Sequence, residues 1–220
     1  MARARSRSGT DAFLKRTLDL VASGLGLLLL SPVLGMTWLL VRLKLGAPAL
    51  FRQERAGLHG RPFWVYKFRT MSDERDGNGE LRPDGDRLTA LGQRLRRASL
   101  DELPQLLNVF RGEMSLVGPR PLYVKYIPRY SPWQARRLEA KPGITGLAQI
   151  SGRNALNWED RLNLDVRYVD EASLLLDLRI LLLTLKKVLR SEGISKAGHA
   201  TMEEFMGTHS PEFPKGPIPK

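Results

Sequence analysis

The stretch SLDELPQLLNVFRGEMSLVGPRP, residues 99–121, is the part of the chain around which the rest is organised. Two acids stand side by side in it, at Asp101 and Glu102. Pro104 disfavours the helical conformation at the residue before it and is itself well suited to the start of a helix. The stretch therefore predicts a short helix over residues 105–110, with both acids just before that helix or in its first turn.

Basic residues flank the two acids on both sides in the sequence: Arg94, Arg96, Arg97, Arg111 and Arg120. A helix N-terminus adds partial positive charge and free backbone N–H groups. This setting predicts ionised carboxylates with lowered pKa values. An ionised carboxylate among arginines suits nucleophilic attack on phosphorus or the binding of a divalent cation. Ser99 followed by Glu102 is equally a capping-box pattern that only starts a helix, so the short pattern alone leaves both interpretations open.

SLDELPQLLNV followed by MSLVGPRP resembles the bacterial sugar transferases, small monotopic phosphoglycosyl transferases that transfer a phospho-sugar to a polyprenyl phosphate. The resemblance implies an α+β fold, a mostly helical monotopic membrane protein with a re-entrant N-terminal membrane helix and a small β-hairpin or sheet. The expected parts are a disordered basic tail (1–12), a re-entrant helix–break–helix (13–48), a cytoplasmic catalytic domain with interfacial helices (49–193) and a polar C-terminal tail without assigned function (194–220).

The chain has 220 residues and a net charge of +12, which implies an anionic partner. That partner is a nucleic acid, an anionic membrane face or a phosphorylated substrate. The chain has no cysteine, which excludes disulfides and zinc–thiolate sites, and its three histidines show no metal spacing. A membrane-tethered nucleic-acid-binding protein is the rival class. No nucleic-acid-binding motif is present, and the basic residues gather around acids, so we expect no nucleic-acid partner.

Residues 18–41 are nearly uncharged after Asp19 and are a membrane-span candidate. Ser31-Pro32 interrupts the run, because an interior proline removes a backbone hydrogen bond and kinks a helix. A kinked span and a re-entrant helix compete, and basic residues on both flanks favour re-entry without deciding it. KRTLD (15–19) and the Ser31-Pro32 break resemble the family's re-entrant helix. The resemblance therefore implies re-entry at the cytoplasmic face of the bacterial inner membrane, with membrane phospholipids as partners.

Residues 49–55 and 62–71 predict two strands joined by a turn. The second strand, PFWVYKFRTM, carries Lys67 and Arg69. On pattern alone, these basic side chains face water from a half-buried strand. The family has a similar KFRTM motif, which implies that Lys67, ahead of Arg69, lies at the active site.

The stretch after this hairpin is polar and rich in glycine. Residues 72–87 predict a loop, and DGNGE lacks the alternating ligands of a calcium-binding loop. Apolar residues at positions 88, 91 and 95 then predict an amphipathic helix that ends among the arginines before Asp101.

Ser131-Pro132 predicts a well-formed helix start, and that helix ends by residue 141. KPGITGLAQISGRN (141–154) follows. Its three glycines, with Thr145, Gln149 and Arg153, suggest a loop where the backbone approaches a ligand. A turn-rich connector is the plain alternative. The family's PGITG and GRN patterns are similar.

Asn157 can cap a helix that continues through Tyr168, with Asp165 one turn earlier. An acid on a wet helix face is the plain interpretation of Asp165. The similar LDxxYV pattern of the family implies that both residues lie near the active site. Residues 173–190 are rich in leucine but interrupted by charges, which predicts an interfacial or core-packing helix and not a second span.

The resemblance implies a two-step transfer. Asp101 attacks the β-phosphate of a UDP-sugar, UMP leaves, and polyprenyl phosphate then attacks the phospho-sugar held on the aspartate. Asp101 would also ligate Mg²⁺, which with the basic residues offsets repulsion between the anions, while Glu102 acts as a base or positions the acceptor phosphate. The substrate-binding residues implied are Lys67, Arg69, Arg96, Arg97, Arg120, Gln149, Arg153, Asp165 and Tyr168. The identity of the sugar and the choice between monomer and homo-oligomer stay open.

Overall fold

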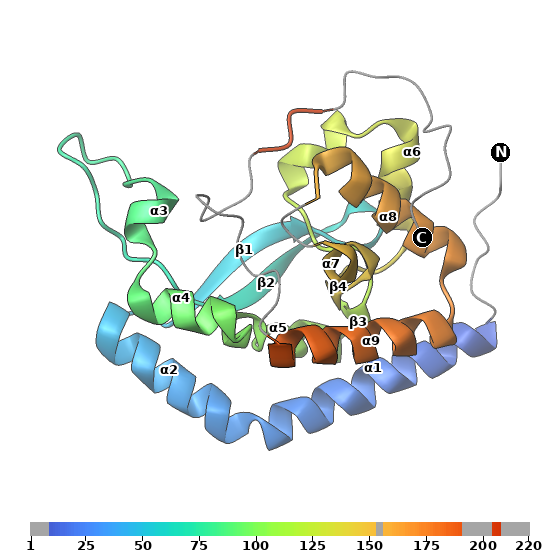
Figure 1. The fold of residues 1–220 in the computed structure, drawn as a ribbon, viewed down its shortest axis with the longest axis horizontal. Coiled ribbons are helices and arrows are strands. Elements are labelled where there is room, and N and C mark those ends of the chain that lie inside the picture. The colour runs from blue at the N-terminus through green and yellow to red at the C-terminus, as the bar shows by residue number, and fades with distance from the viewer. Residues whose placement is uncertain (1–8, 153–155, 191–203, 208–220) are drawn as a thin grey trace.

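The structure is a computed structural model and describes residues 9–152, 156–190 and 204–207. Helices predominate in this part of the chain, and two small sheets of two strands each lie among them (Figure 1). The α+β class implied by the resemblance is therefore confirmed.

Two helices at the start of the chain form a shallow V whose open side faces the rest of the molecule (Figure 1). They are α1 (Gly9–Leu29) and α2 (Ser31–Leu45), bent by 61° at the break between them. Pro32 lies at the start of α2, as the predicted break requires. Within the described residues no single helix is long and apolar enough to cross a membrane, and the two helices of the V pass that test only when taken together.

The first helix begins earlier than the sequence indicated. We expected residues 9–12 to belong to a disordered tail, but they form the first turn of α1. Asp11 lies in that turn, where the positive end of the helix dipole favours an acid.

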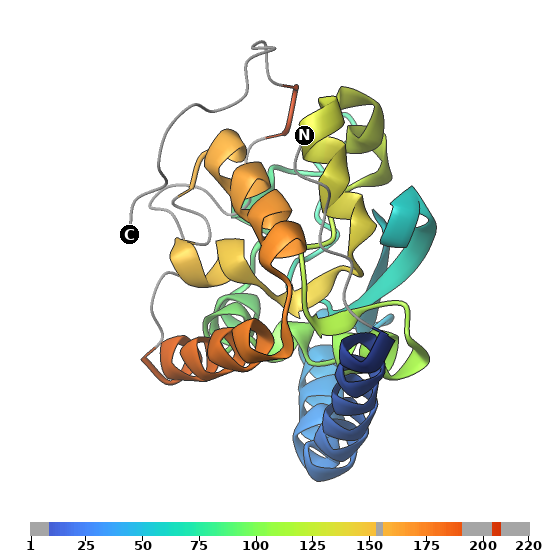
Figure 2. The ribbon, with the colours of Figure 1, turned by 90° about the vertical axis from the view of Figure 1, so that its right-hand side faces the viewer.

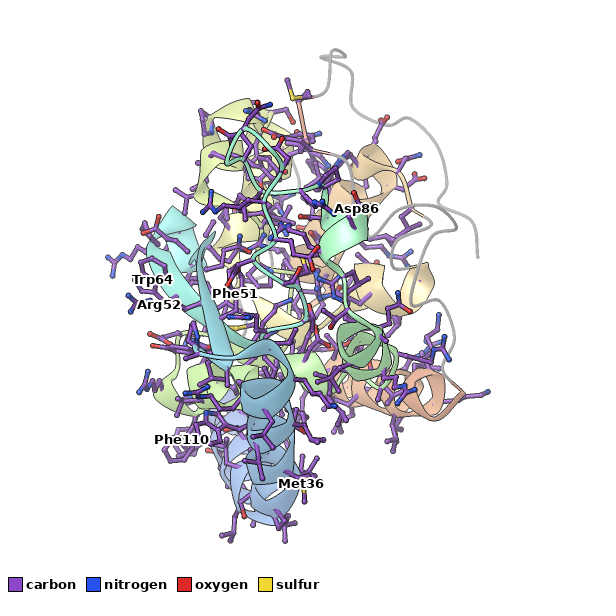
Figure 3. All side chains as sticks on the ribbon, turned by 90° about the vertical axis from the view of Figure 1, so that its left-hand side faces the viewer. Met36, Phe51, Arg52, Trp64, Asp86 and Phe110 are labelled. Atoms are coloured by element: carbon purple, nitrogen blue, oxygen red, sulfur yellow. The ribbon has the colours of Figure 1, made fainter. Side chains whose placement is uncertain are left out.

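The short helix α5 (Gln105–Arg111) rests directly on α1. A Cβ atom on Gly24 would lie 3.3 Å from the ring of Phe110, and one on Gly26 would lie 3.2 Å from Leu106. Gly24 and Gly26 thus allow α1 and α5 to approach each other closely. Phe110 lies beside the V in Figure 3. The remaining surface of the V exposes large apolar side chains on both helices, among them Val21, Leu28, Leu29, Met36 and Leu43.

The predicted hairpin is present as β1 (Leu50–Ala56) and β2 (Pro62–Phe68), which pair antiparallel across the turn η1 (Leu58–Gly60). Asn108 of α5 forms hydrogen bonds with the backbone of β2. Its side chain accepts a hydrogen bond from the Tyr66 N–H at 3.3 Å and donates to the Trp64 carbonyl at 2.7 Å. This contact holds β2 and α5 side by side.

The other elements follow the hairpin in the sequence and complete the fold. In Figure 1, α9 lies alongside α1, and in Figure 2 the V projects below α9. These elements are α3 (Asp84–Arg87), α4 (Ala90–Arg97), η2 (Leu100–Glu102), β3 (Ser115–Val117), η3 (Val124–Arg129), α6 (Pro132–Ala135), η4 (Arg136–Glu139), β4 (Gly143–Thr145), α7 (Leu147–Ser151), α8 (Trp158–Glu171) and α9 (Leu174–Arg190).

Two predicted helix starts are confirmed by their caps. Ser131 and Gln134 form a capping box at α6, and the Asn157 side chain accepts the Asp160 N–H at the start of α8. The loop predicted over residues 72–87 is interrupted by the single turn of α3.

The glycine-rich stretch after residue 141 is not a ligand-binding loop at its first two glycines. Gly143–Thr145 is the strand β4, which pairs in parallel with β3. A Cβ atom on Gly143 would lie 2.1 Å from the backbone nitrogen of Gly118, and one on Gly146 would lie 2.2 Å from the Gly118 carbonyl oxygen. These glycines are required because two segments of the chain's own backbone approach each other there.

Residues 204–207 correct a further expectation, since we assigned them to a polar tail without function. Phe205 is 1% exposed and packs with Tyr126 of η3 and Trp158 of α8. This short segment is therefore part of the folded structure.

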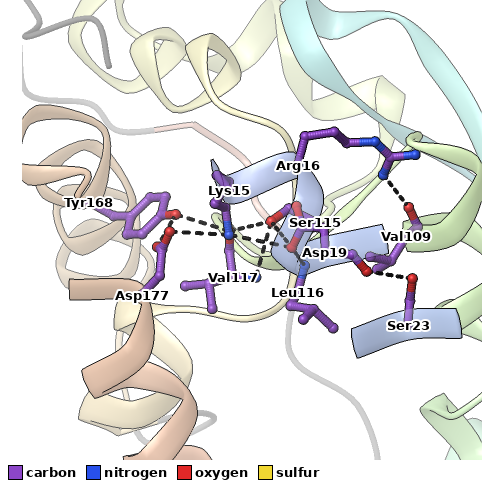
Figure 4. A network of polar contacts seen from close by, with 10 residues as sticks. All are labelled: Lys15, Arg16, Asp19, Ser23, Val109, Ser115, Leu116, Val117, Tyr168 and Asp177. Carbon is purple, nitrogen blue, oxygen red and sulfur yellow. Dashed lines mark hydrogen bonds and ion pairs between the residues drawn. The ribbon is translucent and has the colours of Figure 1, made fainter. Parts of the chain in front are cut away.

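A buried carboxylate on α1 joins the V to the rest of the protein (Figure 4). Asp19 is 2% exposed. It accepts hydrogen bonds from the Leu116 N–H at 2.9 Å and from the Ser115 hydroxyl at 3.1 Å. Both donors belong to β3, so the first residues of that strand are fixed against the membrane-span candidate.

Lys15 extends this joint to the last two helices (Figure 4). Its ammonium lies 3.6 Å from Asp19 Oδ1 and 3.2 Å from Oδ2 of Asp177 on α9. The Tyr168 hydroxyl of α8 lies 2.7 Å from Asp177 Oδ1 and 3.0 Å from the Val117 carbonyl oxygen. We call the side chains of Lys15, Asp19, Ser115, Tyr168 and Asp177 the buried joint.

Asp19→Ala should destabilise the protein strongly, because it leaves buried donors on β3 without an acceptor and removes one of the two partners of Lys15. Breaking a buried charged pair costs about 3–5 kcal/mol. Asp19→Asn should cost less, since its amide oxygen still accepts from the Leu116 N–H. The midpoint of thermal unfolding in detergent measures both, with the exposed Thr17→Ala as control. An Asp19→Ala midpoint equal to the control would show that the buried joint contributes nothing.

Candidate active site

Asp101 and Glu102 lie in η2, a single 3₁₀ turn between α4 and α5. Both acids precede α5, as predicted. Ser99 before the turn has a left-handed backbone (φ 56°), and its side chain makes no capping bond to the described residues of η2. The capping-box interpretation is therefore wrong. A positive φ outside glycine is uncommon and is found disproportionately at functional sites.

Glu102 binds two cations. The Lys67 ammonium of β2 lies 2.7 Å from Glu102 Oε1, and Nη2 of Arg120 lies 2.6 Å from the same oxygen. Burial alone would raise the pKa of Glu102, but the charges of Arg120 and Lys67 outweigh it and hold that pKa well below its usual range. A carboxylate with so low a pKa is a poor general base. The geometry favours Glu102 as an anchor that orients Lys67 and Arg120.

Asp101 has the opposite electrostatic situation. It is 8% exposed, and within the described part of the chain it forms no ion pair or hydrogen bond. Burial and the negative charge of Glu102 raise the pKa of Asp101, although Lys67, Arg96 and Arg120 oppose them. The lowered pKa expected for this residue is therefore wrong. A single 3₁₀ turn supplies little helix dipole, and desolvation outweighs the neighbouring cations.

Arg96 reaches the dyad from α4. Its Nε donates to the Thr70 hydroxyl at 3.2 Å. Gly92 permits this arrangement, because a Cβ atom there would lie 1.9 Å from the Thr70 carbonyl oxygen. The backbones of α4 and of the segment just after β2 thus come into direct contact, which brings the Arg96 charge next to Asp101.

Two predicted basic residues do not join this group. Arg69 points to the junction of α2 and β1, where its guanidinium donates to the carbonyls of Leu45 and Ala47 and pairs with Asp73 at 3.2 Å. Arg97 is exposed at the end of α4. In the structure, Arg69 stabilises the exit from the V, and Arg97 lies on the surface.

Asp165 of α8 connects to the dyad through Arg137, which the sequence analysis missed. Its Oδ2 accepts from Arg137 Nε at 3.0 Å and from Nη2 at 2.7 Å. The same Nη2 donates to the Arg120 carbonyl at 2.6 Å. Burial raises the pKa of Asp165 while Arg137 opposes the rise. Asp165 therefore fixes the backbone of Arg120 by way of Arg137.

The remaining predicted residues are placed differently. Tyr168 belongs to the buried joint and faces Asp177. Gln149 of α7 is half-buried, and neither polar atom of its amide has a hydrogen-bond partner among the described residues. Arg153 lies outside the residues that the structure describes.

Two more arginines that the sequence analysis missed lie near Arg120. The Arg161 guanidinium of α8 lies 5.4 Å from the centre of the Trp158 ring, and that of Arg55 lies 3.7 Å from the Tyr123 ring. Burial and then the nearby charge of Arg120 lower the pKa of Arg161 to about 10. Burial also lowers the pKa of Arg55. Arg161 could have been found from the sequence, because it lies one turn before Asp165 on the same helix face.

Cations outnumber carboxylates in this group, which is the composition of an anion-binding site. Within the described residues, no three histidine, cysteine or acidic side chains are close enough to hold a metal ion by themselves. A Mg²⁺ ion commonly takes one or two carboxylates and completes its shell with water and substrate phosphates. The carboxylate of Asp101, which has no hydrogen-bond or ion-pair partner in the described part of the chain, fits that mode of binding.

Comparison with known proteins shows the family to which the chain belongs. The bacterial sugar transferase family model matches residues 10–191. The uncharacterised sugar transferase EpsL of Bacillus subtilis (strain 168) is 57% identical over 195 residues, which are 89% of this chain and 96% of that protein. The UDP-glucose:undecaprenyl-phosphate glucose-1-phosphate transferase of Caulobacter vibrioides is 44% identical over 188 residues, 81% of this chain and 70% of that protein. The undecaprenyl-phosphate galactose phosphotransferase of Salmonella typhimurium (strain LT2) is 41% identical over 202 residues, 84% of this chain and 42% of that protein. The chain therefore belongs to the bacterial sugar transferase family.

Proposed function

We propose that the protein is a phosphoglycosyl transferase that moves a sugar phosphate from a UDP-sugar to undecaprenyl phosphate or a similar polyprenyl phosphate. One observation carries the proposal: Asp101, a buried carboxylate without a hydrogen-bond or ion-pair partner among the described residues, lies beside three cations. The names of the Caulobacter and Salmonella relatives support the lipid acceptor.

In the first step, an oxygen of Asp101 attacks the β-phosphorus of the UDP-sugar. A bond from Asp101 oxygen to phosphorus forms, the bond from that phosphorus to the bridging oxygen of the diphosphate breaks, and UMP leaves with the electron pair. A desolvated carboxylate with no hydrogen bonds is a stronger nucleophile than a solvated one. Lys67, Arg96 and Arg120 supply positive charge where negative charge develops on the phosphate oxygens.

In the second step, a phosphate oxygen of the polyprenyl phosphate attacks the same phosphorus, and the Asp101 carboxylate leaves. The product is a polyprenyl diphosphate-sugar. Splitting one displacement between two anions into two steps allows each step to use the same cations. Glu102 contributes by holding Lys67 and Arg120 in place through both steps.

We further propose that Mg²⁺ is bound by Asp101 together with the diphosphate oxygens of the substrate. When bound, such an ion neutralises charge on the diphosphate and on the leaving UMP. Arg161 and Arg55 add positive charge near Arg120 and are suited to the second phosphate of the donor. Gln149 and Arg153 remain predicted substrate-binding residues.

We propose that the V is a re-entrant membrane segment and that the protein lies on the cytoplasmic face of the inner membrane. Three features support this. The V opens toward the rest of the chain (Figure 1), basic residues flank both of its ends, and α9 exposes Leu175, Leu182 and Leu185 beside it. Because α5 rests on α1, the dyad just before α5 would lie near the lipid headgroups, where a lipid acceptor and a soluble nucleotide can meet.

The wild type should release UMP even without an acceptor, and Asp101→Asn should abolish this release. The substitution removes both the charge and the nucleophile while keeping the shape of the side chain. Intact mass of the wild type incubated with a UDP-sugar and Mg²⁺ should show a sugar-phosphate increment on the peptide around Asp101, and a chelator should prevent it. The exposed Asp86→Asn is the matched control. If the wild type turns over with acceptor but rapid-quench samples never contain the adduct, and UMP release requires the lipid, Asp101 is not the nucleophile.

The pH profile should depend on Glu102. A raised pKa means that Asp101 takes up its proton, and the reaction stops, at a higher pH than an ordinary aspartate would allow. Glu102→Gln removes the negative neighbour that, after burial, raises this pKa. Its residual UMP release should therefore persist to lower pH than that of the wild type. The exposed Glu54→Gln should leave the profile unchanged. An acid limb that moves to higher pH in Glu102→Gln would contradict this assignment.

The chain lacks cysteine, so single cysteines can report the topology without a background signal. Thr10 lies at the start of the V and His59 follows the V in the sequence, and both are exposed, so each is suited to replacement by cysteine. A membrane-impermeant maleimide should label both in inside-out vesicles and neither in intact cells. Labelling of Thr10→Cys from outside intact cells would mean that the V spans the membrane.

A further inference from the structure

The short segment Glu204–Gly207, which we call the strap, packs against η3 and α8. In sequence, the described residue that precedes it is Arg190. Its one large buried side chain is Phe205, which is 1% exposed. The ring centre of Phe205 lies 5.2 Å from that of Trp158, 5.7 Å from that of Tyr130 and 5.8 Å from that of Tyr126. Phe205 thus fills the centre of an aromatic cluster contributed by two separate parts of the catalytic domain.

Polar contacts on either side hold the strap in one orientation. Glu204 lies 2.8 Å from Arg129 Nη1 and 2.9 Å from the Lys125 ammonium, and Arg129 also donates to the Phe205 carbonyl. Exposed ion pairs of this kind contribute little stability individually. They determine the direction of the strap, and the burial of Phe205 supplies most of the attachment.

Two of the arginines near the dyad also pack against rings of this aromatic cluster. The Arg161 guanidinium lies 5.4 Å from the Trp158 ring, and that of Arg137 lies 5.7 Å from the Tyr130 ring. The Tyr130 hydroxyl lies 3.5 Å from Arg137 Nη1. Arg137 in turn donates to the Arg120 carbonyl. A continuous series of contacts therefore leads from Phe205 through two rings to the cations of the site.

We propose that Phe205 is a positioning residue for the phosphate-binding side of the active site, acting through Trp158 on Arg161. The inference rests on the proposed function, because the site is the one assigned to the UDP-sugar. Without Phe205, the Trp158 ring loses an aromatic neighbour at 5.2 Å and is held less firmly. Arg161, whose guanidinium packs on that ring, is then positioned less precisely. The strap completes the site from behind and touches no reacting atom.

The test compares Phe205→Ala with its neighbour Met206→Ala, whose side chain is 71% exposed. Misplacement of a binding group by about 1 Å can cost up to ~100-fold in rate. We expect Phe205→Ala to lower kcat/KM for UDP-sugar in the UMP-release assay by about tenfold, mainly through a higher KM. Met206→Ala should match the wild type, and Phe205→Leu, which keeps part of the buried apolar volume without overpacking, should recover part of the loss.

A double-mutant cycle separates positioning from stability. If Phe205 acts through Arg161, the variant carrying both Phe205→Ala and Arg161→Ala should lose no more than Arg161→Ala alone, since coupled residues are not additive.

Each outcome has one meaning. A wild type that releases no UMP from any UDP-sugar refutes the proposed function, whatever the strap does. A wild type that is active, with Phe205→Ala of unchanged KM and kcat, refutes the strap inference alone. Strictly additive losses in the cycle also refute it, because Phe205 would then act independently of Arg161. A lower unfolding temperature with unchanged kinetics would make Phe205 a structural residue only.

Discussion

The carboxylate of Asp19 is the contact on which the arrangement of the whole molecule depends. It lies on a helix whose outer surface is apolar, yet it is almost completely buried because β3 supplies two donors and Lys15 supplies a charge. A charge in such surroundings is stable only when all its partners are present. The position of α1 is therefore specified relative to β3 and, through Lys15 and Asp177, relative to α9. The dyad inherits this order, because it directly precedes α5, which rests on α1.

Two neighbouring acids in this site have different properties because their surroundings differ. Glu102 is surrounded by Lys67 and Arg120 and stays ionised, whereas Asp101 is desolvated beside a negative charge and has a raised pKa. Pairs of acids whose environments separate their pKa values commonly divide one reaction between them. Here one acid organises cations and the other is left free to react. A helix-dipole argument alone predicts the same shift for both, and it fails because burial dominates at Asp101.

Local patterns predict much of this fold. The hairpin, the helix after Pro104, and the caps at Ser131 and Asn157 each depend on a few adjacent residues, and the structure contains all of them. Contacts between residues that are distant in the sequence are harder to predict. Arg137 and Phe205 show no motif, and their importance comes from neighbours distant in the chain. Arg69 shows the converse, since its motif is similar to that of the family while its side chain binds carbonyls at the end of α2.

Gly118 belongs to the stretch MSLVGPRP, which also contains Arg120 of the site. A Cβ atom on Gly118 would lie 2.2 Å from the Lys141 carbonyl oxygen and 3.0 Å from the Gly143 nitrogen, so no side chain could be accommodated. Glycine is required at this position for steric reasons, whereas Arg120, two residues later, contributes charge to the site. A sequence motif interpreted as a list of catalytic residues would therefore merge two independent physical requirements. Substitution at Gly118 would separate the β3 and β4 segments, and the resulting loss of activity would say nothing about contact with the substrate.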